Sequence, residues 1–131
     1  MRVIEEKVTV YPPHAICRAD VPIILAALPA DWSAGIRCVR LCASHKRIPQ
    51  LIAYQNTFDG SLTVKSRGVS KECTLRAVLT ELAGRALGLT FLGGHRLQKR
   101  DQSRVERMVE PLVEVILPQL SSKKVWLPER T

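Results

Sequence analysis

The stretch Val78-Leu79-Thr80-Glu81-Leu82-Ala83-Gly84 decides the fold, because it lies at the centre of the most regular helical pattern in the chain. Apolar residues recur around it at the three- and four-residue spacing of one helix face, namely Leu75, Val78, Leu79, Leu82 and Ala86. Ser70 precedes the pattern as a candidate N-cap. We therefore expect a helix that starts after Ser70, ends at Gly93-Gly94 and buries this stripe in the core.

The opposite face of the same helix consists of small residues, namely Ala77, Thr80, Gly84 and Gly88. A glycine inside a helix costs about 1 kcal/mol relative to alanine, so Gly84 indicates that another element approaches the backbone closely. This face is either an open cleft or is filled by a neighbour. Glu81 and Arg85 stand one turn apart, and an ion pair on the surface is the simplest role for Glu81.

Strand patterns occupy much of the chain before this helix, at Ile4–Val10, Ile36–Ala43, Leu51–Gln55 and Leu62–Ser66. Asp59-Gly60 predicts the turn between the last two strands. Between the first two, Asp20 is a candidate cap for a short helix with Pro22 in its first turn. The expected fold is α+β, with an N-terminal strand and helix, a small three- to four-stranded sheet and then the long helix.

A second amphipathic helical pattern runs from Val105 to Leu120. Ser103 and Glu106 have the spacing of a capping box at its start. Pro111 interrupts the pattern and predicts a kinked or restarted C-terminal helix. At 131 residues and 46% hydrophobic content, the chain is long enough to bury one core, and we expect a single domain over residues 1–131.

The order of these elements, together with the Glu81 helix, resembles the small zincin-like metallopeptidase domains. In zincins this helix carries His-Glu-x-x-His, whose imidazoles bind zinc while the glutamate acts as general base. With Glu81 in the place of the glutamate, the histidine positions fall on Thr80 and Gly84, and neither side chain binds metal as imidazole does. A shift of one residue would instead place Arg85 at the second position, which also removes the site.

The resemblance covers about residues 20 to 120 as a pattern of elements. The stretch from Ser103 to Glu110, where the family's third ligand would be sought, offers acids but no unambiguous ligand. The resemblance therefore implies a non-catalytic zincin-like domain, a degenerate metallopeptidase without zinc or another cofactor. Its role would be that of a binding or structural module, with a protein partner that the sequence does not identify.

The four cysteines, Cys17, Cys38, Cys42 and Cys73, are expected to be reduced and mostly buried, because no secretory leader precedes them. The spacing of Cys38, Cys42 and His45 is one that metal ligands can have. In a strand, however, Cys38 and Cys42 would lie about 13 Å apart, too far for one tetrahedral ion. We therefore predict no metal site, and a surface or capping role for His14 and His95.

The chain contains no apolar run of the length that spans a bilayer. Glu5 and Glu6 interrupt the segment where a secretory signal would have its apolar region. The expected location is therefore cytoplasmic, without a membrane association.

The net charge of +8 raises an alternative function, a small basic α+β module that binds nucleic acid or another polyanion. Residues 37–76 hold eight basic residues but only two acids, and the candidates for polyanion binding are Arg37, Arg40, Lys65 and Arg67. Aromatic residues make up only 5% of the chain and do not interleave with the basic ones, as a base-stacking surface requires. We therefore favour a solvated basic face over nucleic-acid binding.

Overall fold

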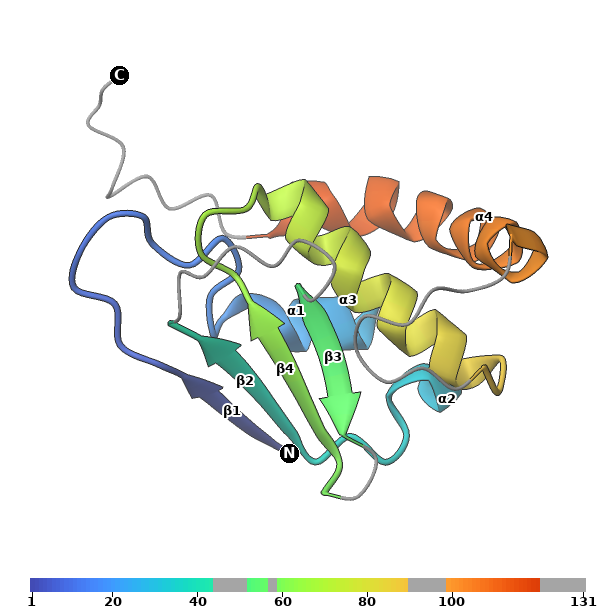
Figure 1. Cartoon of the computed structure of the whole chain (residues 1–131), viewed down its shortest axis with the longest axis horizontal. Helices are drawn as coiled ribbons and strands as arrows, with labels where there is room; N and C mark the ends of the chain where they lie inside the picture. Colours follow the sequence, from blue (N-terminus) through green and yellow to red (C-terminus); the bar gives the residue numbers. More distant parts are fainter. Residues whose placement is uncertain (44–51, 57–58, 90–98, 121–131) are drawn as a thin grey trace.

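The computed structural model describes residues 1–43, 52–56, 59–89 and 99–120 (Figure 1). Its architecture is α+β, as the sequence predicts, with a four-stranded sheet and four α-helices in the described ranges. The strands are β1 (Arg2–Glu5), β2 (Cys38–Cys42), β3 (Ala53–Asn56) and β4 (Ser61–Lys65). The helices are α1 (Asp20–Ala26), α2 (Ala30–Ser33), α3 (Lys71–Ala86) and α4 (Lys99–Ile116), followed by the short 3-10 helix η2 (Leu117–Gln119).

The sheet has the order β1-β2-β4-β3. β1, β2 and β4 are parallel, whereas β3 runs antiparallel to β4 and forms one edge. The strand predicted over Ile36–Ala43 corresponds to β2, which lies between β1 and β4. The turn at Asp59-Gly60 is also present: Gly60 adopts φ 72°, and the Asp59 carboxylate accepts the Ser61 N–H at 3.0 Å.

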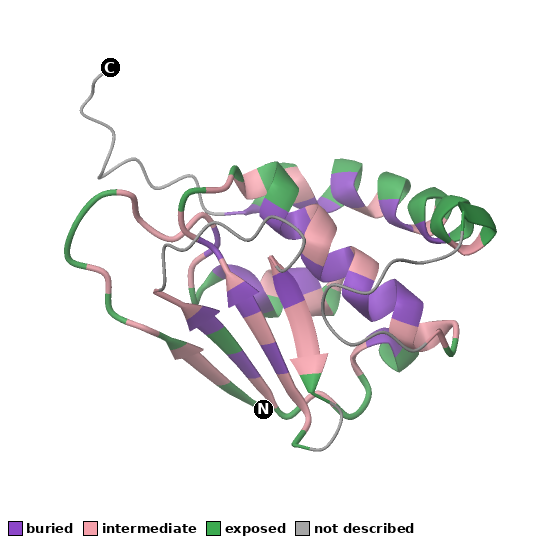
Figure 2. Cartoon of the chain, viewed as in Figure 1, coloured by how far each residue is buried: buried purple, intermediate pink, exposed green. Residues whose placement is uncertain are grey.

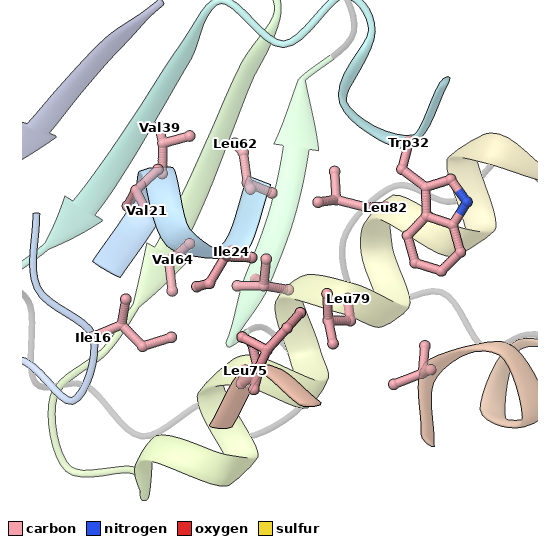
Figure 3. Close-up of a cluster of buried hydrophobic side chains, with 14 of the residues drawn as sticks. Ile16, Val21, Ile24, Trp32, Val39, Leu62, Val64, Leu75, Leu79 and Leu82 are labelled. Atoms are coloured by element: carbon pink, nitrogen blue, oxygen red, sulfur yellow. The ribbon is translucent and has the colours of Figure 1, made fainter. Parts of the chain in front are cut away.

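One face of the sheet carries the core. Strand residues Val39, Leu41, Leu62 and Val64 are each at most 3% exposed and alternate with half-buried or exposed residues (Figure 2). In Figure 3, side chains from the strands meet side chains from α1 and α3, and Trp32 lies beside Leu82; the labelled residues of these elements are Val39, Leu62 and Val64 of the sheet, Val21 and Ile24 of α1, and Leu75, Leu79 and Leu82 of α3. Complete burial of each such side chain contributes about 1.5–3 kcal/mol, so this single cluster holds the two layers together.

Helix α3 starts as the sequence predicts. The Ser70 hydroxyl accepts the Cys73 N–H at 3.0 Å and caps the helix. Its end was predicted wrongly, because α3 stops at Ala86 rather than at Gly93-Gly94. Gly88 has φ 75° and the Leu89 N–H bonds the Gly84 carbonyl at 2.9 Å, which is the left-handed glycine stop of many helices. Gly88 is thus a terminator and not a member of the small face.

Helix α4 packs on α3 and buries Val105, Val109, Val113 and Ile116. The capping box predicted at Ser103 is wrong, because α4 already begins at Lys99 and Ser103 lies inside it. The helix also continues through Pro111 without a restart. Pro111 and Arg107 are both exposed, so water can bond the Arg107 carbonyl that proline deprives of its helical partner.

The N-terminal strand is shorter than predicted. It ends at Glu5, and Val10 beyond it is 61% exposed, so the alternating pattern to Val10 does not reflect pairing. Asp20 is not a helix cap but the first residue of α1, with Ala19 at the cap. The Asp20 carboxylate is buried and accepts a hydrogen bond from the Cys17 N–H at 3.0 Å. None of the described helices is long and apolar enough to cross a membrane.

Two side chains tie the segment after β1 to the sheet. His14 lies between β4 and the end of β1, with Nδ1 2.5 Å from the Ser66 hydroxyl and Nε2 2.8 Å from the Glu6 carbonyl oxygen. The Arg67 guanidinium donates to the backbone carbonyls of Pro12, Ala43 and Val10 at 2.7, 2.8 and 3.1 Å. The surface or capping role expected for His14 is therefore replaced by a structural one, and Arg67 is a structural residue as well.

Replacing Arg67 by lysine should lower the free energy of unfolding by about 1–3 kcal/mol, because a single ammonium cannot serve three separate carbonyls. Arg40→Lys is the matched control, since Arg40 is exposed and forms an ion pair with the partly exposed side chain of Glu6; it should change stability by less than about 0.5 kcal/mol. Urea denaturation of the three proteins measures the difference. Equal midpoints for Arg67→Lys and the wild type would contradict the structural role.

Candidate functional site

The predicted motif lies where α3 runs beside the edge strand β3. Glu81 is in the third turn of α3 and is 8% exposed, so it does not lie on the surface. Gln55 of β3 donates its Nε2 hydrogen to the Glu81 carbonyl oxygen at 3.0 Å and approaches the carboxylate Oε1 at 3.5 Å. The surface ion pair predicted between Glu81 and Arg85 is wrong, because the carboxylate instead faces the sheet edge.

Burial raises the pKa of the Glu81 carboxyl from 4.5 to about 7, although the contacts with Gln55 counteract part of this shift. No cation contacts the carboxylate within the described residues. Both the protonated and the ionised form of the carboxyl are therefore accessible near neutral pH. A carboxyl with this pKa can both donate and accept a proton at physiological pH.

Thr80, the first of the two histidine-equivalent positions, points to the other side of α3. It is half-buried and lines a polar groove of about 630 Å³ between α3 and α4. The remaining lining residues are Arg76 from α3 and Ser103, Glu106, Arg107, Val109 and Glu110 from α4. Arg76 is held at the rim by ion pairs with Glu72 and Glu110. Glu106 and Glu110 of α4, two of the acids predicted near this site, therefore line the same groove as Thr80 of α3.

Gly84, the second position that the resemblance aligns with a histidine, belongs to the buried residues of α3. Within the described residues, the small face of α3 is thus not a continuous open cleft, because Gly84 is buried whereas Thr80 lines the groove. Arg85, the alternative position, turns its guanidinium toward Gly35, where a β-carbon on Gly35 would collide with Nη2. Its Nη1 is buried, with no hydrogen-bond partner among the described residues.

The described residues contain no cluster of three or more histidine, cysteine or acidic side chains suited to a metal ion. Cys38 and Cys42 stand at opposite ends of β2, as the strand prediction implies, and both His45 and His95 lie outside the described residues. The expectation that the cysteines are mostly buried is wrong, because Cys73 is exposed and the other three are half-buried. Cys17 donates its thiol to the Asp20 carboxylate at 3.4 Å.

The four candidates for polyanion binding do not form one group. Arg40 and Lys65 project from the sheet face opposite the core, Arg37 precedes β2 at the other end of the strands, and Arg67 is fixed by its three carbonyl partners. Arg40 pairs with Glu6 at 3.2 Å. The backbone N–H of Ala43, bonded to the Glu6 carboxylate, together with Arg40 holds the pKa of Glu6 below its usual value.

Sequence reasoning missed the partner of Glu81. Gln55 sits 26 residues earlier and meets Glu81 only because β3 turns back antiparallel to β4. The period of α3 places Glu81 beside the apolar stripe, between Val78 and Leu82, and this was the one signal of its burial. Comparisons with protein-family models, with curated proteins and with solved structures find no match for the chain.

The buried Glu81 carboxyl should make stability fall as pH rises. The pKa of Glu81 is about 7 in the folded state and 4.5 in the unfolded state, so the folded state holds the proton more tightly. The stability that this proton contributes is fully present below pH 4.5 and is lost as pH rises through 7. The free energy of unfolding of the wild type should therefore fall by an amount on the order of 2 kcal/mol between pH 5 and pH 8 because of Glu81. Glu81→Gln should not show this fall, because glutamine does not titrate. Thermal denaturation across this range measures it. An identical pH slope in both proteins would mean that Glu81 is ionised and solvated.

Gly84→Leu should destabilise the protein by about 1–3 kcal/mol, because the site is enclosed and a large side chain overpacks it. Cys73→Leu serves as the control on the same helix, since Cys73 is exposed and leucine is the better helix former. Denaturant midpoints compare the two. A gain in stability for Gly84→Leu would show that nothing packs against this turn of α3.

Proposed function

We propose that this chain is a non-catalytic zincin-like domain, a degenerate metallopeptidase that serves as a binding or structural module. The observation that carries the proposal is the position of Glu81: it lies on the helix that follows the parallel strand β4, under the antiparallel edge strand β3, and contacts Gln55 there. The order of strands and helices before it agrees with the same resemblance.

The donor groups argue against an active peptidase. Zinc in hydrolases takes three protein ligands, usually imidazole or carboxylate, and keeps one position open for water. Thr80 offers a hydroxyl and Gly84 no side chain, so α3 supplies neither imidazole. Glu81 retains a carboxyl with a pKa near 7, but a general base of this kind needs a metal-bound water, which α3 without imidazoles does not supply. The domain therefore acts by binding a partner or by structural support, and an unidentified protein partner fits this role.

The first test is direct. The purified chain should hold no stoichiometric zinc after dialysis and should cleave no peptide substrate. Elemental analysis and a peptide-library digest measure both properties. One zinc per chain, lost together with proteolysis on chelation, would replace this proposal by an active enzyme.

The second test restores the missing ligands. Thr80→His with Gly84→His gives α3 a His-Glu-x-x-His sequence, and Glu106 lines the groove at Thr80 as a further donor. If the site is a vestige, this variant should bind zinc about 10- to 100-fold more tightly than a pair of histidines on an ordinary helix surface. Arg100→His with Arg104→His provides that comparison, because both positions are exposed and one turn apart on α4.

Zinc-dependent stabilisation is the readout, because a metal that binds only the folded state raises the melting temperature even of a destabilised variant. The cobalt complex adds an independent report through its visible absorption. Equal affinity of the two histidine pairs would mean that α3 holds no remnant of a zinc site. The zincin-like proposal would then lose its main support.

A further inference from the structure

The sheet face opposite the core is covered by no described helix. In Figure 1, α1 lies behind the strands and the near face of the sheet carries no helix. Thr63 shows this by its environment, because it belongs to β4, which has a strand on each side, and is nevertheless only half-buried. An element packed on this face would have buried Thr63 as completely as Leu62 and Val64 are buried on the other. We call this surface, which no described helix covers, the outer face.

The outer face is cationic. The residues that alternate with the core positions include Arg2, Arg40 and Lys65, and none of the outward positions in the four strands is acidic. Two acids beyond the strands act on Arg40: Glu6 pairs with it at 3.2 Å, and Asp59 has a weaker electrostatic interaction with it. Both side chains of the Arg40–Glu6 pair are more than one-third exposed, so the pair contributes little and a phosphate can replace Glu6. No ion pair engages Lys65 within the described residues.

Strand pairing brings an aromatic ring into this cationic surface. Arg40 of β2 and Tyr54 of β3 are both opposite Thr63 of β4, so the three residues form one row across the outer face. At the usual strand spacing, the Arg40 and Tyr54 backbones lie about 10 Å apart. Lys65 is the diagonal neighbour of Tyr54, at about 7–8 Å. The aromatic residue that sequence order separates from the basic residues therefore lies among them.

We propose that the outer face binds single-stranded nucleic acid, with Tyr54 stacking on a base while Arg40 and Lys65 contact phosphates. An aromatic ring flanked by cations on an open sheet surface is the combination that holds unpaired bases and their backbone. A duplex fits less well, because its bases are stacked on each other and no described element projects from the outer face to enter a groove. Such binding is tolerant of sequence, since every base has a stacking face.

Fluorescence anisotropy with a labelled oligothymidylate at low salt tests the proposal. Tyr54→Ala should weaken binding about 5- to 150-fold, the range for loss of one stacked base, whereas Tyr54→Phe should retain it. Arg40→Ala with Lys65→Ala should lower the slope of log affinity against log salt by about 0.7 for each lost phosphate contact. Arg67 is left unchanged, because its carbonyl contacts make it necessary for the fold.

The matched control is Arg100→Ala with Arg104→Ala, which removes the same charge from exposed positions on α4. It should leave both the affinity and the salt slope nearly unchanged. If this control weakens binding as much as the outer-face pair does, attraction to the net charge alone explains the data and the proposal fails. It also fails if Tyr54→Ala binds as well as Tyr54→Phe, if duplex DNA binds as tightly as the single strand, or if the wild type does not bind. Circular dichroism verifies that each variant is folded.

Discussion

The packing of α3 between the sheet and α4 is the constraint on which the rest of the structure depends. Leu75, Leu79 and Leu82 have no exposed surface, and the same helix contacts β3, β4, α2 and α4. A helix enclosed on two sides has little room for charged residues, so each polar group on it needs a specific environment. Thr74 meets this need by donating its hydroxyl to the Ser70 carbonyl at 2.9 Å. Glu81 meets it through Gln55 and a raised pKa.

The same enclosure explains which features of α3 could be predicted from sequence. Its apolar stripe and its Ser70 cap are local patterns, and both are present. The environment of Glu81 depends on β3, which is distant in sequence, and a local rule of helix pairs therefore assigned it to Arg85. Gly88 shows a different limit: the three- and four-residue spacing extends one turn beyond the helix, because a glycine suits a small helix face and a left-handed stop equally well.

The sheet illustrates the limit of local patterns again. The strand positions were found to within a few residues, since alternation of apolar residues is visible along the chain. Pairing is not visible in the same way, and it is pairing that places Tyr54 in one row with Arg40. Arg67 was grouped with the basic candidates by charge alone, whereas its guanidinium is occupied by carbonyls from Val10, Pro12 and Ala43. A count of charges thus located a basic segment but could not separate binding residues from structural ones.

The two proposed surfaces meet at β3, and the alternation of a strand keeps them independent. Gln55 points to α3 and contacts Glu81, while its neighbour Tyr54 points to the outer face. Adjacent residues of a strand occupy opposite faces of the sheet, so a substitution at one of these positions leaves the side chain of the other in place. A binding function on that face requires neither metal nor the ionised form of Glu81, and it is therefore independent of the chemistry of α3.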